Sequence, residues 1–565
     1  MTKMDRTIYP TRLHYAGLKT RSLLATTCLS VIIGSFGSND AHAGAIETNI
    51  PDLTINWINT LTFSSLYRTE TPNKLAYADA NEDDSIRNIR SNLAAQRFDL
   101  LSQLDIKYKS FGIRGSASAW DDLIYNFKNT NNSAGTLNSL VADNKDYSKH
   151  TQQLAGYHAE ISDLFGYGSF AFANNSRVSF RVGQFTQLWG ESLFLATNGV
   201  SAGQNPIDAI KAQLLLNPQA RDIYMPTPQI SVTYEPTPDL SFSAYYKFDW
   251  RRTRISPAGS YFSTTDVLDV GADRLFAGES PIGGQSYFSR GSDIRPHGLD
   301  NQFGINVRYK IGDYDLGLYA IRYDDTTPGQ VLYLHPKSAI ADAAAFSSGS
   351  NNIGSYQVAF AKGIQIYGAS FSTNIFQVIN LAGEISARRN AALASGSLIV
   401  PMTAGNGNNV FYPMGDTLHA QVSAVYASVP IRWLHTDSLQ VLGEIGGNHL
   451  LGISQNSAAF SPTANKTAML GTVVASLSYL QLFNKTDVTP SVGLSWDFYH
   501  TSPIDLGDRA HTGNVNAGLT MLYNQTWSLQ FQYKHFFGNV SNVNDALNNT
   551  YLGKDYSGLE LQRTF

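Results

Sequence analysis

The sequence contains little cysteine and little charge. One cysteine in 565 residues excludes a disulfide scaffold. Only 15% of the residues are charged, where about 25% is usual, and the formal net charge of −4 gives no reason to expect a nucleic-acid partner. After residue 43 no apolar run reaches the roughly 20 residues that a membrane-spanning helix needs. Aromatic residues, in contrast, make up 12% of the chain, and an apolar fraction of 43% excludes a disordered polymer.

Residues 1–43 have the composition of a secretory signal peptide. A basic start is followed by an apolar stretch from Ser22 to Gly37, and Ala41-His42-Ala43 supplies small residues at the spacing that a signal peptidase recognises. The apolar stretch is too short for a membrane anchor. We therefore expect residues 1–43 to be removed on export and residues 44–565 to form the mature domain.

The mature chain alternates between apolar and polar residues with a period of two, which predicts β-strands. From Ser241 to Trp250, every second residue is an aromatic or alanine, and the residues between them are polar, apart from Tyr245. The segments Arg177–Gly183 and Gln302–Lys310 alternate in the same way, and the chain ends on an alternating segment closed by Phe565. Such segments are typical of a transmembrane barrel, although a soluble β-sandwich would also alternate.

Three observations favour the barrel. Predicted short connections, such as Lys109-Ser110, alternate with long ones, such as 190–227, which is the pattern of periplasmic turns and extracellular loops. The terminal Phe565 is the kind of ending that the barrel-assembly machinery recognises. Tryptophans stand near predicted segment ends, where membrane interfaces favour amphipathic rings; these are Trp57, Trp120, Trp250, Trp496 and Trp527.

Eight short turns and nine long loops predict an all-β, closed antiparallel barrel of about 18 strands, with both ends periplasmic. Sixteen strands are also compatible, because the segment Ser355–Thr373 alternates only faintly. The expected location is the outer membrane of a Gram-negative cell, with outer-membrane lipid around the barrel. The long loops are expected to fold partly into the lumen.

Strand parity predicts which charged side chains face the lumen. An Arg or Lys facing lipid would cost roughly 2–4 kcal/mol at the midplane, so these residues are expected inside. They can form structural ion pairs between strands, or a charged constriction that selects solutes. The predicted inward residues are Arg181, Lys247, Asp249, Arg308, Glu384, Arg388, Glu444 and Lys534.

The segment from Gly183 to Asp208 is predicted to fold inward. Parity places Gly183 and Trp189 on the inner face, and a glycine there leaves room for a group to approach the wall. Glu191 is expected to pair with a base such as Arg181 or Arg251. The alternative is that Trp189 belongs to the lipid-facing aromatic girdle.

A short helix is expected within Asn205–Leu216, with Asn205 as its cap and Pro206 in its first turn. This helix could pack on the barrel rim or fold into the lumen.

No catalytic, cofactor or metal-binding motif stands out. The sequence has no Gly-x-Ser-x-Gly elbow, no His-Glu-x-x-His motif and no phosphate loop. A serine could still meet His500 or His511 in space, but we expect no enzyme.

The first predicted strand begins near Ile55, which leaves no room for the plug domain of an energised transporter. Passive movement is the better interpretation, and a periplasmic carrier could assist it.

Several stretches together resemble one family of proteobacterial outer-membrane proteins, numbered thirteen-oh-two among the domains of unknown function. They are Arg181–Phe194, Asn198-Gly199, Asn205–Asp208, Tyr245–Trp250 followed by Ser256–Asp266, and Ile366–Thr373 followed by Gly383–Ser386. The resemblance implies a β-barrel that, in some members, brings alkanes and similar hydrophobic compounds across the outer membrane. The charged inner face by itself would favour a porin for polar or anionic solutes, and a surface structural or adhesion barrel is the third alternative. The oligomeric state and the substrate stay open.

Overall fold

The computed structural model describes residues 44–565, except 73, 78, 297–298, 300, 330, 396–398, 402–411, 428–429, 505–508, 539–550 and 552. The predicted signal peptide lies outside the described residues.

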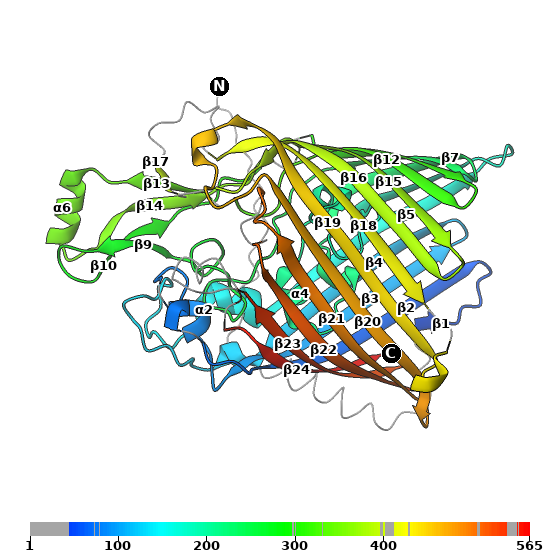
Figure 1. The fold of residues 1–565 in the computed structure, drawn as a ribbon, viewed down its shortest axis with the longest axis horizontal. Coiled ribbons are helices and arrows are strands. Elements are labelled where there is room, and N and C mark those ends of the chain that lie inside the picture. Colours follow the sequence, from blue (N-terminus) through cyan, green and yellow to red (C-terminus); the bar gives the residue numbers. More distant parts are fainter. Residues whose placement is uncertain are drawn as a thin grey trace. The chain divides into compact units, whose positions relative to one another are not determined.

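Eighteen antiparallel strands pair into a closed ring, which confirms the predicted barrel and its strand number (Figure 1). The ring closes where the first strand pairs with the last, for example Thr60 opposite Thr564. A short strand, β1 (Gly44–Ile46), also pairs with β2. The barrel strands are β2 (Leu53–Arg68), β3 (Leu93–Tyr108), β4 (Phe111–Asp122), β5 (Tyr157–Ala171), β6 (Arg177–Phe185), β7 (Thr227–Thr237), β8 (Leu240–Lys247), β11 (Phe303–Ile311), β12 (Tyr314–Tyr323), β15 (Ile364–Ile375), β16 (Ile379–Ala392), β18 (Met414–Ala427), β19 (Ser438–Gln455), β20 (Thr467–Phe483), β21 (Thr486–Tyr499), β22 (Thr512–Tyr523), β23 (Trp527–Phe537) and β24 (Tyr556–Thr564).

The outer surface of the ring is apolar, as the sequence alternation predicts. On β11, Phe303 and Ile305 are exposed on the outside, while the alternate residues Gly304 and Asn306 are buried on the inside. Large exposed apolar residues recur in this way around the ring, from Ile113 on β4 to Val515 on β22. Such a surface suits lipid and would be unfavourable in water.

Only part of the predicted tryptophan girdle is present. Trp57 and Trp496 are exposed on the outer surface. The prediction was wrong for Trp120, which is only 3% exposed and lies on the inner face of β4. Trp250 lies in a loop, where its indole N–H donates to the backbone carbonyl of Asp325. Period-two alternation alone does not show whether an aromatic residue faces lipid or the lumen, because such a ring can lie on either face.

Short turns join the strands at one end of the barrel. Between β22 and β23, Asn524 and Gln525 both have positive φ angles, 51° and 57°. Two such residues form the primed turn whose twist matches a hairpin. The long loops leave the opposite end (Figure 1).

The long loops build a second, five-stranded sheet beyond the barrel, seen at the left of Figure 1. The faint segment Ser355–Thr373 is divided between the two sheets, because its first residues belong to β14 and its remainder to barrel strand β15. The sheet contains β9 (Arg274–Glu279), β10 (Gln285–Arg290), β13 (Leu332–Pro336), β14 (Asn352–Val358) and β17 (Ile399–Pro401).

Helices occur only as short elements in the loops and turns. None of the described helices is long and apolar enough to cross a membrane. They are α2 (Asp84–Arg87), α3 (Lys149–Thr151), α4 (Ala209–Leu214), α5 (Ala220–Ile223) and α6 (Ala339–Ser347), together with the 3₁₀ and π turns η2 (Lys74–Tyr77), η3 (Leu123–Asn126), η4 (Gln152–Gly156), η5 (Val200–Gly203), η7 (Arg432–Leu434) and η8 (Ser457–Ala459).

Candidate functional site: a segment held across the lumen

Residues 186–226, which connect β6 to β7, fold into the barrel, and we call them the plug segment. Its helix α4 contributes Ile210 and Leu214 to a buried cluster with Leu66 on β2 and Tyr556 on β24. The helix therefore packs against the inner wall rather than on the rim. It begins later than predicted, because Asp208, and not Asn205, accepts the hydrogen bond from the Lys211 amide that caps it.

One face of the plug segment is held by Glu444, on the inner face of β19. Its carboxylate accepts the backbone N–H of Leu193, at 3.1 and 3.2 Å, and that of Leu195, at 2.7 Å. The N–H of Phe194 also donates to it. Three consecutive amides converge on one carboxylate, so this part of the plug is fixed by its backbone path. Its side chains do not make the attachment.

Glu384 on β16 holds a second stretch in the same manner. It accepts the backbone N–H of Glu191 at 3.1 Å and of Val200 at 3.2 Å. A Cβ atom at Gly199 would collide with the Glu384 carboxylate, so glycine is required there for the close approach. Further along the same strand, Arg388 donates to the carbonyls of Thr197 and Gly199, at 2.7 and 3.0 Å.

Gln421 on β18 lies between the two carboxylates. Its amide donates to Glu384 at 2.9 Å and to Glu444 at 3.2 Å, so we call these three residues the carboxylate latch. Asn198 of the plug donates to the Gln421 carbonyl at 3.1 Å. The sequence prediction missed Gln421, since a neutral amide in an alternating strand carries no distinguishing signal, and it named Asn198 only as part of a stretch that resembles the family. The inward parity of Glu384 and Glu444 was the only indication of the carboxylate latch in the sequence prediction.

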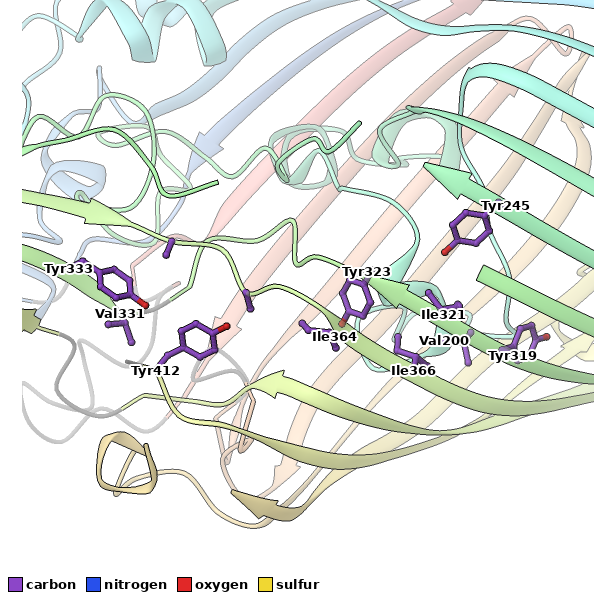
Figure 2. Close-up of a cluster of buried hydrophobic side chains, with 12 residues drawn as sticks. Val200, Tyr245, Tyr319, Ile321, Tyr323, Val331, Tyr333, Ile364, Ile366 and Tyr412 are labelled. Atoms are coloured by element: carbon purple, nitrogen blue, oxygen red, sulfur yellow. The ribbon is translucent and has the colours of Figure 1, made fainter. Parts of the chain in front are cut away.

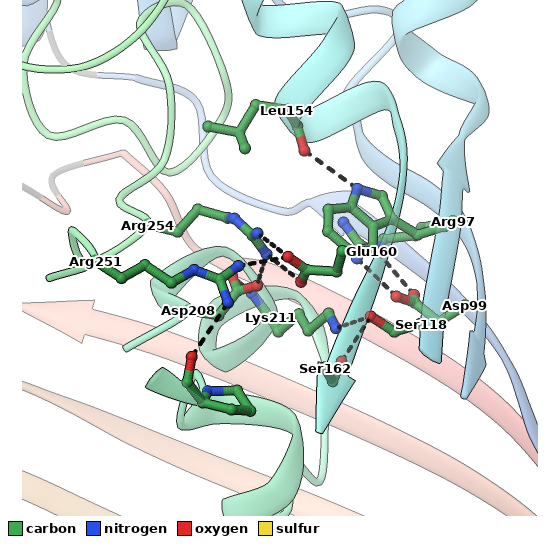
Figure 3. A network of polar contacts seen from close by, with 12 residues as sticks. Arg97, Asp99, Ser118, Leu154, Glu160, Ser162, Asp208, Lys211, Arg251 and Arg254 are labelled. Carbon is green, nitrogen blue, oxygen red and sulfur yellow. Dashed lines mark hydrogen bonds and ion pairs between the residues drawn. The ribbon is translucent and has the colours of Figure 1, made fainter. Parts of the chain in front are cut away.

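The other face of the plug segment is held by ion pairs, shown in Figure 3. Arg254, from the β8–β11 loop, makes two hydrogen bonds to Glu160 on β5, at 3.1 and 2.8 Å. The same guanidinium pairs with Asp208, the cap of α4. Arg251 also pairs with Glu160, at 2.5 Å. A plug residue, a loop residue and a wall residue thus share one network, which we call the ion-pair anchor.

The ion-pair anchor packs against the indole ring of Trp120. Three cationic side chains lie over it within 5.1 Å of its centroid: Arg97, Lys211 and Arg254. Its N–H donates to the Leu154 carbonyl at 3.1 Å. The negative face of an indole attracts cations, which explains why a tryptophan occupies this inner-wall position.

Trp189, at the start of the plug segment, lies inside the barrel and not in a lipid-facing girdle. Its ring centroid is 5.0 Å from that of Tyr245 on β8 and 6.4 Å from that of Tyr319 on β12. Its backbone N–H donates to Gln204, at 2.6 Å, within the plug. Trp189 packs against a buried cluster that extends from Tyr319 within the barrel to Tyr333 in the external sheet (Figure 2).

Glu191 pairs with a basic residue of the wall, as predicted, but neither of the two partners named for it is the one found. Glu191 pairs with Arg308 on β11, at 2.8 Å, and not with Arg181 or Arg251. Arg181 instead donates to Gln187 at 2.7 Å, and Arg251 is engaged by Glu160. The chain turns toward β11 and β16 after Trp189, and this direction could not be derived from strand parity.

Three further predicted residues lie in different settings. Lys247 is buried on the inner wall, where it donates to the Gly203 carbonyl of the plug at 3.4 Å. Asp249 lies beyond the end of β8 and is exposed, because that strand stops at Lys247 and not at Trp250 as predicted. Gly183 has φ of 131°, and a Cβ there would lie 2.3 Å from the Leu164 carbonyl. The wall itself therefore requires this glycine, so it is not evidence for a ligand.

Near the short turns, the inner wall encloses a cavity of about 690 Å³. Five basic residues line it, against the two acids Asp105 and Glu235. Among the described residues, only one of the five lies within 4.0 Å of a carboxylate, since Arg177 is 3.9 Å from Glu235. We call this cavity the basic vestibule; its basic residues are Lys107, Lys109, Arg114, Arg177 and Arg181.

A closed ring of 18 antiparallel strands with an apolar outer surface defines a transmembrane β-barrel, and the plug segment folds into its lumen. The chain belongs to the family described as Protein of unknown function (DUF1302), whose model matches residues 24–565. This is the family that the sequence resembles. A search of curated proteins found no match.

Solved structures with a similar fold include three bacterial proteins. OccAB3 of Acinetobacter baumannii is 12% identical, with 90% of this chain and 99% of that chain covered and a TM-score of 0.42. The outer membrane channel DcaP of the same organism is 9% identical, with 93% and 100% covered and a TM-score of 0.37. OccK9 of Pseudomonas aeruginosa is 9% identical, with 92% and 99% covered and a TM-score of 0.40.

Proposed function

We propose that the protein is an outer-membrane channel for the passive uptake of hydrophobic small molecules, such as alkanes, fatty acids or related lipids. The observation that carries this proposal is the apolar cluster in Figure 2. It runs from Val331 and Tyr333 of the external loops to Val200 of the plug segment and Tyr319 of the wall. These side chains are buried against one another, so an apolar solute entering from the loop side would have to part them on its way past the plug.

A hollow in the outer wall is consistent with apolar cargo leaving sideways. It has a volume of about 620 Å³ and crosses β15 to β20. Outward-facing residues such as Ile385, Val422 and Ile445 line it. Glu384 and Glu444 are the inward-facing neighbours of Ile385 and Ile445 along their strands. Release of the carboxylate latch would therefore occur directly behind this hollow.

The second candidate function is a porin for anionic solutes, and the basic vestibule favours it. Lys107, Lys109 and Arg114 face the cavity without an ion-pair partner among the described residues. Rings of basic side chains select anions in aqueous pores. A fatty acid would satisfy both observations, since its tail is apolar and its head group is an anion.

The deciding experiment compares a deletion strain on hydrophobic and on small polar carbon sources, with conductance of the purified protein measured beside it. The proposal predicts slow growth on alkanes or fatty acids and normal growth on polar substrates. Normal growth on every hydrophobic substrate, together with a large open conductance, would favour the porin. No conductance and no growth defect would favour a structural or adhesion barrel.

Trp189→Ala tests the proposed route at one residue. Removing the indole from its contacts with Tyr245 and Tyr319 should lower uptake several-fold and leave the amount of heat-resistant folded barrel unchanged. Trp433→Ala is the matched control, because Trp433 is 79% exposed in the turn between β18 and β19. If transport per folded molecule is the same in both variants, Trp189 is only a structural residue.

The proposed partners follow from the location. Outer-membrane lipid would cover the apolar surface, and the assembly machinery would recognise Phe565, whose backbone pairs with Asn59. A periplasmic carrier could receive the cargo at the end where the basic vestibule opens.

A further inference from the structure

Three carboxylates are buried together in the long loops. Asp83 and Asp84 stand at the start of α2, in the loop between β2 and β3, and Asp266 comes from the loop between β8 and β11. One oxygen of each lies within 4.8 Å of the others. All three residues have an exposed fraction of 0%. The cluster thus joins two loops that are far apart in the sequence.

The charge of this cluster is poorly compensated. Asp83 pairs with Arg87, but within the described part of the chain no basic group lies within 4.0 Å of Asp84 or Asp266. Asp84 accepts the Asn138 backbone N–H at 3.1 Å, and Asp266 accepts the Asp84 backbone N–H at 2.9 Å. These donors are neutral. Buried charges in proteins are normally paired or bound to a metal.

Two buried oxygens also lack a donor, one on Asp83 within the cluster and one on Asn138, whose backbone N–H donates to Asp84. Within the described residues, no hydrogen bond reaches Oδ1 of Asp83 or Oδ1 of Asn138. Asn138 is fully buried, and its side-chain amide is already used by Asn81 and the Arg274 carbonyl, at 2.9 and 2.8 Å. A buried acceptor without a partner costs about 1–3 kcal/mol. Asn138 is not an acid, so its free oxygen is evidence separate from the carboxylates.

We propose that Asp83, Asp84 and Asp266, with Asn138, form a calcium-binding site. Calcium takes oxygen ligands at 2.3–2.6 Å, so two ligands on opposite sides of the ion lie about 4.6–5.2 Å apart. The 4.8 Å limit within the cluster fits this span. Magnesium needs a tighter octahedron and keeps several waters, and zinc favours the nitrogen and sulfur ligands that these four side chains do not offer.

Calcium bound there would fasten the loops that pack over one end of the plug segment. The β8–β11 loop that carries Asp266 also carries Tyr261 and Phe262, whose rings pack in the same cluster as Ile210 of the plug. Asn138 belongs to a third loop, between β4 and β5. One ion would therefore tie three loops together beside helix α4.

The test uses the full mature barrel, folded in detergent and stripped with EGTA. Titration with calcium alone should give one ion per chain, with a dissociation constant of about 10⁻⁴–10⁻³ M, the range of extracellular calcium modules. Asp84→Asn/Asp266→Asn should weaken binding at least ten-fold. Asp143→Asn is the matched control, because this aspartate of the β4–β5 loop is partly exposed and pairs with Lys128. It should bind like the wild type.

A second measurement needs no variant. Calcium, but not magnesium, should slow trypsin cleavage within residues 69–92 of the wild-type barrel several-fold, and EGTA should reverse this. Heat-resistant migration on a gel shows that each protein is folded. Absence of calcium binding by the folded wild type would overturn the proposal, as would equal binding by the wild type and the double variant. In either case the carboxylates would be held by protons and hydrogen bonds alone.

Discussion

The plug segment is attached to the barrel at two places, and the chemistry of the two attachments differs. At the carboxylate latch, Glu384 and Glu444 accept N–H groups of the plug backbone. At the ion-pair anchor, Arg254 joins side chains from the wall and the plug, Glu160 and Asp208. The latch depends on the path of the loop backbone and on Gly199, where a Cβ atom would collide with Glu384. The anchor depends on the identity of individual side chains.

This difference has an energetic consequence. Hydrogen bonds to a charged group contribute roughly 1.5–3 kcal/mol each, and the latch carboxylates receive several from the plug. A buried ion pair contributes less on balance, because the cost of removing both charges from water offsets their attraction. We expect the latch to hold the plug in place and the anchor to fix the position of α4.

The largest effect is expected from Glu384→Ala/Glu444→Ala, which removes the latch. Its loss should weaken the attachment by about 3 kcal/mol or more, and that shifts the ratio of closed to open plug roughly 100-fold. Single-channel recording should show long open events that are rare in the wild type. Glu279→Ala is the control, because Glu279 is exposed on β9. Identical traces for all three proteins would show that the latch does not hold the plug.

Glu160→Ala should have a smaller effect at the anchor. Arg254 keeps its contact with Asp208, so the open fraction should rise only about ten-fold, equivalent to about 1.4 kcal/mol. Protease cleavage within residues 209–223 should increase in parallel. Glu235→Ala is the matched control, since its pair with Arg177 is 3.9 Å long and exposed. If Glu160→Ala opens the channel more than removal of both latch residues, the ranking of the two attachments is wrong.

The smallest effect on gating is expected from a change that leaves both attachments intact. Lys107→Gln/Arg114→Gln removes two charges from the basic vestibule. The preference of the open channel for anions should fall several-fold, because the field of these bases raises the local anion concentration. Reversal potentials in a salt gradient measure this, with Lys337→Gln as the control, because Lys337 follows β13 of the external sheet. An unchanged preference would show that the vestibule does not select ions.

The ring of strands could be predicted from the sequence, but the two attachments could not. The alternation at Gln302–Lys310 and the turn at Asn524-Gln525 are local signals, and both are present in the structure. The pairing of Glu191 with Arg308 depends on the direction in which a loop turns after Trp189. That direction is set by contacts with β16 and β19, about 200 residues further along the chain. Local periodicity contains no information about such contacts.

Trp120 illustrates the same limit within a strand. Its position near the end of an alternating segment predicted a lipid-facing ring, whereas it lies under three cationic groups inside the barrel. All three cations come from other segments of the chain: Arg97 from the neighbouring strand β3, Lys211 from the plug segment and Arg254 from the β8–β11 loop. The position of a tryptophan along a strand therefore did not reveal its face, because its partners were not local.

The central claim is that the plug segment must leave the wall for a solute to pass, and a reversible cross-link tests it most directly. A Cβ atom at Gly368 on β15 would lie 2.8 Å from a methyl group of Val200 on the plug, so Val200→Cys/Gly368→Cys should form a disulfide. The single cysteine of the sequence lies in the predicted signal peptide and would not interfere. The account predicts that the oxidised variant loses uptake and open events, that reductant restores both, and that Val200→Cys alone does not respond to the oxidant. Full uptake by the oxidised, cross-linked barrel would contradict it.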